Sequence, residues 1–105
     1  MNETLNNHRF QAEKLIDKEK YTQLMASNLK VLRAKAGMTQ DDLSKAAGIS
    51  RQTIVQAEAT HKLSWGTYLS LVFLFSTDEG TFELMRLLDI YPENLKLSSF
   101  TDEGE

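Results

Sequence analysis

The 105-residue chain contains no cysteine, which excludes disulfide scaffolds, cysteine-ligated zinc sites and cysteine nucleophiles. It also lacks a long apolar run. The longest, Leu71–Phe75, has five residues, far fewer than the roughly 20 that a membrane-spanning helix needs. The opening residues, MNETLNNHRF, include no apolar segment of the kind found in secretory signals. These absences predict a cytoplasmic protein with no membrane association.

Proline is nearly absent as well, since Pro92 is the only one. No segment alternates polar and apolar residues for long enough to indicate a strand. Helical patterns are instead expected over residues 21–36, 39–47, 50–59, 65–75 and 81–88. We therefore expect an all-α fold of five helices around one core, with an additional N-terminal helical arm. The expected division is an arm at 1–20 that is partly helical or disordered, a helical domain at 21–90 and a tail at 91–105.

Two short helical patterns lie close together between Thr39 and Ala59, separated by Gly48. Thr39 is a suitable N-cap for the first pattern and Ser50 for the second. Gly48 can adopt a positive φ, which would end the first helix and turn the chain. The residues expected on the buried side of the first helix are Leu43, Ala46 and Ala47. Together these signals predict two helices joined by a tight turn.

The second of these patterns has an unusual outward face. A helical wheel places the small apolar residues Ile54 and Ala57 on one side and gathers polar residues on the other. That polar side carries Arg51, Gln52 and Gln56 around Val55. Arginine can bond guanine in a bidentate manner, glutamine can do the same to adenine, and valine can touch a thymine methyl group. The same residues are also compatible with an ordinary solvated surface.

The net charge of −3 is unevenly distributed along the chain. Residues 28–62 carry six basic and three acidic side chains, whereas residues 63–105 carry two basic and eight acidic ones. Local field rather than total charge attracts a polyanion, so the basic excess around the two central helices is compatible with nucleic-acid binding.

Residues 32–59, LRAKAGMTQDDLSKAAGISRQTIVQAEA, resemble the helix-turn-helix domain of phage repressors and Xre-type bacterial regulators. The resemblance implies a lambda-repressor-like five-helix fold whose second paired helix enters the DNA major groove. The base-reading residues it implies are Arg51, Gln52, Val55 and Gln56. Contacts to the DNA backbone are implied for Thr39, Gln40, Ser50, Thr53, His61 and Lys62. It further implies a partly buried ion pair between Arg33 and Glu58.

One feature departs from the family pattern. Many relatives end the recognition helix with Glu-x-Gly, whereas here Glu58 is followed by Ala59, Thr60 and His61. The helix is therefore expected to run further or to end differently, and the loop has only His61 and Lys62 to offer a phosphate.

We expect a sequence-specific double-stranded DNA-binding protein, a bacterial or phage transcription regulator that acts as a homodimer on a pseudo-palindromic operator. Two alternatives stay open: an antitoxin that also regulates its own promoter, and a protein-interaction module that has lost DNA binding. A toxin or co-regulator is thus a possible protein partner. Enzymatic activity, metal ions and other cofactors are not expected, because the two histidines, His8 and His61, are far apart and no catalytic motif is present.

Overall fold

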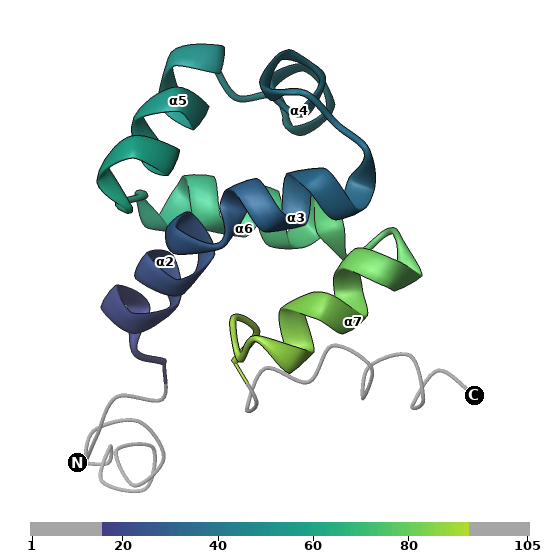
Figure 1. Cartoon of the computed structure of the whole chain (residues 1–105). Coiled ribbons are helices and arrows are strands. Elements are labelled where there is room, and N and C mark those ends of the chain that lie inside the picture. The colour runs from purple at the N-terminus through teal and green to yellow at the C-terminus, as the bar shows by residue number, and fades with distance from the viewer. Residues whose placement is uncertain (1–15, 93–105) are drawn as a thin grey trace, which may run out of the picture. The chain divides into compact units, whose positions relative to one another are not determined.

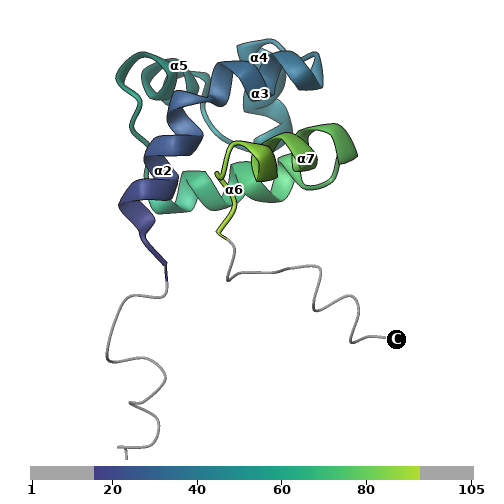
Figure 2. The same cartoon turned by 60° about the horizontal axis from the view of Figure 1, so that its bottom comes forward.

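The computed structural model describes residues 16–92, which form six α-helices and no strand. The helices are α2 (Lys18–Ser27), α3 (Leu29–Ala36), α4 (Gln40–Ala47), α5 (Arg51–Thr60), α6 (Trp65–Phe75) and α7 (Glu79–Leu87). The predicted all-α class is confirmed. Residues 18–91 make one compact unit, in which α4 and α5 pack against each other at one end, while α7 packs against α3 and α6 away from that pair (Figures 1 and 2).

The expected arm and tail fall largely outside the described residues. Helix α2 begins at Lys18, and the chain is described as far as residue 92. The division into arm, domain and tail therefore stays a prediction.

Short polar side chains begin the helices that position the site. Thr39 accepts the Asp42 N–H at 3.0 Å, and the Asp42 carboxylate accepts the Thr39 N–H at 3.0 Å, which makes a capping box at the start of α4. These bonds from Thr39 hold the pKa of Asp42 below its ordinary value. Ser50 caps α5 by accepting the Thr53 N–H at 3.1 Å, and Ser64 caps α6 in the same way. The predicted caps are confirmed.

The single helix predicted over residues 21–36 is wrong, because Asn28 divides it into α2 and α3. The Asn28 backbone does not have helical geometry, since its φ is −111° and its ψ is 11°. Its side-chain amide donates to the Leu24 carbonyl at 2.9 Å, to which its backbone N–H also bonds at 3.1 Å. A local bond of this kind competes with the regular helical ladder. Because the apolar spacing continues across the break, the sequence pattern did not indicate that the helix is interrupted there.

Helix α6 supplies the centre of the core. Tyr68, Leu71 and Phe75 are buried on it, and the Tyr68 hydroxyl donates to the Ile90 carbonyl at 2.8 Å. Burial raises the pKa of this hydroxyl, since the charged form would lose its solvation. Val72 of α6 and Ile90, which follows α7, are buried as well. The rest of the core comes from α2, α3, α4, α5 and α7 and consists of Met25, Leu29, Leu32, Leu43, Ile54, Ala57 and Met85. Leu43, Ile54 and Ala57 thereby anchor α4 and α5 to the body of the protein.

A cation–π contact joins α2 to an aromatic pair at the start of α6. Trp65 stacks on Tyr68 with ring centroids 4.8 Å apart and planes inclined by 17°. The Lys18 ammonium lies 5.3 Å from the centroid of the Trp65 ring, within the range of a cation–π interaction. The first turn of α2 is therefore held against the first turn of α6.

One face of α6 has no cover within the described residues. Leu69 and Phe73, one helical turn apart, are 44% and 77% exposed. On α4, Ala46 is exposed too, although the sequence pattern had placed it on the buried stripe with Leu43. Burying the single methyl group of an alanine contributes little to stability, so the position of an alanine on a helical wheel is a weak indicator of whether it is buried.

Candidate nucleic-acid interface

The backbone carbonyl and the side-chain hydroxyl of Ser44 both form hydrogen bonds that hold the turn between α4 and α5. Gly48 takes φ +68°, and its N–H and the N–H of Ile49 both bond to the Ser44 carbonyl. The Ser44 hydroxyl donates in turn to the Ile49 carbonyl. Because Ile49 is also partly buried against the core, the turn fixes the angle at which α5 leaves α4. Sequence reasoning missed Ser44, whose role depends on the turn closing over it.

Helix α5 turns one face to the core and the other to solvent. Ile54 and Ala57 are buried, whereas Arg51, Gln52 and Gln56 are exposed and Val55 is half-buried. The inward and outward sides are those expected from the sequence. Arg51, Gln52 and Gln56 lie within the first six residues of the helix, toward the end that a recognition helix directs to base edges. That these residues read bases stays a prediction.

A partly buried ion pair ties α3 to α5. Arg33 Nε donates to Glu58 Oε2 at 2.7 Å and Nη2 donates to Oε1 at 3.1 Å, a bidentate geometry in which the side chains are 15% and 11% exposed. Nη1 of the same arginine donates to the Met38 carbonyl at 3.1 Å. Arg33 thus also clamps the segment that leads into α4.

Burial alone would raise the pKa of the Glu58 carboxyl. The hydrogen bonds from Arg33 and Gln40 and the charge of Arg33 outweigh burial, so its pKa lies below the ordinary value. The hydrogen bonds that Arg33 donates to Glu58 raise the pKa of Arg33, although burial opposes this. Each charge is stabilised by the other, and neither is left unpaired inside the protein.

The Gln40 side chain is directed toward Glu58 inside the protein, and not only toward the solvent, where a DNA phosphate would lie. Its side-chain Nε2 donates to Glu58 Oε1 at 3.0 Å, so part of the amide is engaged inside the protein. The first backbone N–H groups of α4 have no acceptor within the helix and remain at its positive end. A phosphate contact by the Gln40 side chain stays a prediction.

The other residues expected at the DNA backbone lie at the surface near α4 and α5. The hydroxyls of Ser50 and Thr53 lie 2.8 Å apart in a mutual hydrogen bond. Thr39 is exposed and engaged in the capping box. His61 and Lys62 are exposed just after α5. His61 takes φ +61°, so it ends the helix in the left-handed conformation that glycine supplies in many relatives.

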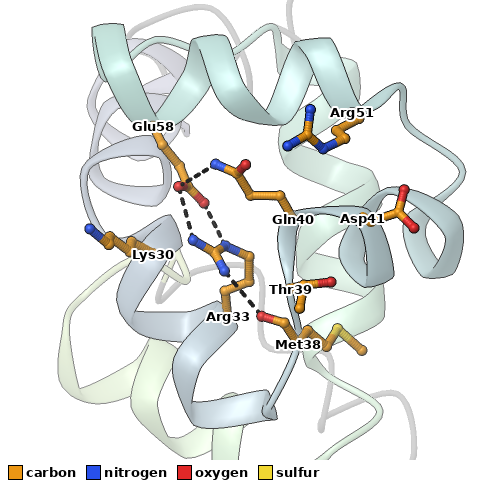
Figure 3. Close-up of a pocket in the computed structure, with 8 residues that line it drawn as sticks. All are labelled: Lys30, Arg33, Met38, Thr39, Gln40, Asp41, Arg51 and Glu58. Atoms are coloured by element: carbon orange, nitrogen blue, oxygen red, sulfur yellow. Dashed lines mark hydrogen bonds and ion pairs between the residues drawn. The ribbon is translucent and has the colours of Figure 1, made fainter.

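Some of these side chains gather around a pocket between α3, the start of α4 and α5. Its lining consists of Lys30, Arg33, Met38, Thr39, Gln40, Asp41, Arg51 and Glu58 (Figure 3). Gln52, Gln56, His61 and Lys62 do not line it. Sequence reasoning missed Lys30 and Asp41, whose exposed positions carry no distinguishing pattern. Among residues 16–92, no group of three or more acidic or histidine side chains is placed to hold a metal ion. In the same part of the chain, no helix has the length and apolar character to cross a membrane.

Comparison with known protein families gives a match to part of the chain. Residues 29–59, from α3 to near the end of α5, match the family model described as Helix-turn-helix. Neither the curated proteins nor the solved structures provide a match. The matched segment contains the capped α4, the Gly48 turn and the α5 face described above. Residues 29–59 of this all-α chain are thus similar to the helix-turn-helix of Xre, Cro and lambda-repressor-like DNA-binding regulators.

Proposed function

We propose that this protein binds double-stranded DNA in a sequence-specific manner and regulates transcription in a bacterium or phage, in the cytoplasm. The observation that carries the proposal is the outward face of the first six residues of α5. There, Arg51, Gln52 and Gln56 are exposed around Val55, while the opposite side of the helix is buried. A rigid helix of this kind presents bidentate donors and acceptors without bulky neighbours between them.

In this arrangement α5 lies in the major groove with its first turns against the base edges. Arg51 bonds guanine, the two glutamines bond adenine, and Val55 contacts a thymine methyl group. A phosphate is held at the start of α4, where Thr39 and the amides of its first turn lie. The backbone on the other side of the groove is contacted by His61 and Lys62. Phosphate contacts of this kind set the register of α5 on the duplex.

A homodimer would supply the specificity that one helix lacks. A good bidentate contact discriminates by about 1–3 kcal/mol, so a single α5 distinguishes few sites. Two copies on a pseudo-palindrome, with half-sites about one helical turn apart, would double the number of bases read. The exposed face of α6 supports this proposal, since Leu69 and Phe73 are uncovered and no charged residue occurs between Trp65 and Phe75. An uncharged face can meet its own copy without like-charge repulsion.

Selection from a pool of random duplexes tests the proposal. We expect one sequence family to be enriched, with an affinity that falls steeply as salt rises because several phosphates are contacted. Arg51→Ala and Gln52→Ala should remove the sequence preference and leave most of the salt-dependent, non-specific binding. Gln23→Ala is a matched control, because Gln23 is exposed on α2 outside the proposed interface.

If no duplex is enriched at low salt, sequence-specific DNA binding is ruled out and the protein-interaction module is favoured. A small partner that co-purifies in fixed ratio and whose toxicity this chain suppresses would instead identify an antitoxin. Enrichment that survives Arg51→Ala and Gln52→Ala would show that another surface reads the DNA.

A further inference from the structure

Five charged side chains line the pocket between α3, the start of α4 and α5, and three of them are already neutralised. Arg33 and Glu58 form the shielded ion pair, with Nε and Oε2 2.7 Å apart. The Asp41 carboxylate lies 3.3 Å from the Lys45 ammonium on its own helix. The two side chains that remain are both cations, so the lining keeps positive charge that none of its carboxylates balances.

The two cations are Lys30 on α3 and Arg51 at the first residue of α5. Both are exposed, and within residues 16–92 neither forms an ion pair or a side-chain hydrogen bond. The charge of Lys30 helps to lower the pKa of the Glu58 carboxyl. Both oxygens of that carboxylate, however, already accept hydrogen bonds from other side chains. The ammonium of Lys30 is therefore available to an anion from outside the described chain.

The positive charge is spread over three elements. Figure 3 shows Lys30 and Arg51 on opposite sides of Gln40, the first residue of α4. The first N–H groups of α4 lie between the two cations and add the partial positive charge of a helix start. Phosphates recur about every 3.4 Å of duplex axis along each DNA strand. A surface with charge at its two edges and at its centre fits such a row better than it fits one small anion.

We propose that Lys30 binds the DNA backbone, at a phosphate beside the one held at the start of α4. Helix α3 is then a third element in contact with the duplex, in addition to α4 and α5. This inference rests on the proposed DNA-binding function, in which Arg51 is assigned to a base and Lys30 has no part. A lysine acts on a phosphate as a point charge, so its contact adds affinity and salt dependence and carries no sequence information.

The first test compares two charge-removing substitutions on the same helix. On the selected duplex, Lys30→Gln should reduce the salt slope by about one, so that its affinity deficit shrinks about threefold to fourfold between about 50 and 200 mM salt. The preference for the selected sequence should be unchanged. Lys35→Gln is the matched control, because a Cβ at Gly80 would lie 3.1 Å from the Lys35 Cε, which places this lysine beside α7. It should leave the slope unchanged, and equal slopes in the two variants would overturn the inference.

The second test locates the contact on the duplex. Uncharged methylphosphonates replace the phosphates of the selected duplex one at a time. At one position we expect the wild-type protein and Lys35→Gln to lose affinity, while Lys30→Gln loses nothing further, since its contact is already absent. If every replacement weakens all three proteins equally, Lys30 contacts no phosphate and the inference is overturned. The proposed function would survive that result, because the duplex would still be selected and read.

A purely structural role for Lys30 gives a different outcome. If its charge served only to stabilise Glu58, Lys30→Gln would lower the urea midpoint of the free protein and leave the salt slope unchanged, which would overturn the inference. We expect instead an unchanged midpoint and a reduced slope. Failure of all duplex selection would overturn the proposed function, and the inference with it.

Discussion

At the scale of single residues, the ion pair of Glu58, the one carboxylate on the inward side of α5, is expected to contribute strongly to the stability of the fold. The pair with Arg33 is shielded from water, whereas the Asp41–Lys45 pair on α4 is 3.3 Å long with side chains 58% and 78% exposed. Removing one partner of a shielded pair leaves an uncompensated charge inside the protein. The two pairs should therefore differ widely in what they contribute to stability.

We expect Glu58→Gln to lower the free energy of unfolding by about 3 kcal/mol, because Arg33 keeps its charge and loses its partner. Asp41→Asn, the matched change at an exposed pair, should cost about 0.5 kcal/mol. Urea denaturation followed by circular dichroism measures both. Equal losses in the two variants would contradict a special role of the shielded pair.

The same carboxylate predicts a dependence of stability on pH. The pKa of Glu58 is lower in the folded protein than its ordinary value of 4.5, so it contributes stability above that value. That contribution is lost as the pH falls below 4.5 and through the folded pKa. The wild-type unfolding free energy should thus fall more steeply between pH 5 and pH 3 than that of Glu58→Gln. Parallel pH profiles for the two proteins would rule out Glu58 as the source.

The end of α5 gives a second prediction at the residue scale. His61 holds φ +61°, a conformation that costs a residue with a Cβ about 1 kcal/mol or more and costs glycine little. His61→Gly should raise the free energy of unfolding by about 1 kcal/mol in urea denaturation. Ala59→Gly, two residues earlier inside the helix, should lower it by about the same amount. A loss of stability in His61→Gly would mean that the chain does not turn there as described.

At the scale of the elements, two glycines show opposite requirements. Gly48 ends α4 at φ +68°, whereas Gly66 lies in the first turn of α6, is exposed and has open space where a Cβ would be. We expect Gly48→Ala to destabilise the protein by about 1 kcal/mol and Gly66→Ala to stabilise it by about 0.5–1 kcal/mol. Differential denaturation of the two variants measures the contrast. If Gly48 were an ordinary helical residue, Gly48→Ala would stabilise the protein as Gly66→Ala does.

These elements also show which features a sequence can predict. Caps such as Thr39 and Ser50 were predictable because their hydrogen bonds join residues three apart. The break at Asn28 was not, because a local side-chain bond interrupted an apolar pattern that continues across it. The bond between Gln40 and Glu58 joins residues 18 apart and depends on which rotamers meet once α4 and α5 have packed. The face of α5 was predictable from its period, but the pocket behind it was not.

At the scale of the whole molecule, the proposed dimer can be tested on α6. Phe73 is 77% exposed, so Phe73→Asp should remove an apolar contact between copies with little effect on folding of one copy. We expect sedimentation to show a dimer for the wild-type protein on its operator duplex and a monomer for this variant. Leu87→Asp is the control, since Leu87 is 73% exposed on α7. A wild-type protein that is monomeric both free and on the duplex would disprove the dimer.

Trp65 is the only tryptophan of the chain, and it is placed between Lys18 of α2 and Tyr68 of α6. Its intrinsic fluorescence therefore reports on one specific junction without an added label. Detachment of the first turn of α2 would remove the ammonium from the ring and change the emission, while the far-ultraviolet signal of the remaining helices would be nearly unchanged. The protein thus carries its own optical probe for distinguishing local fraying of α2 from cooperative unfolding.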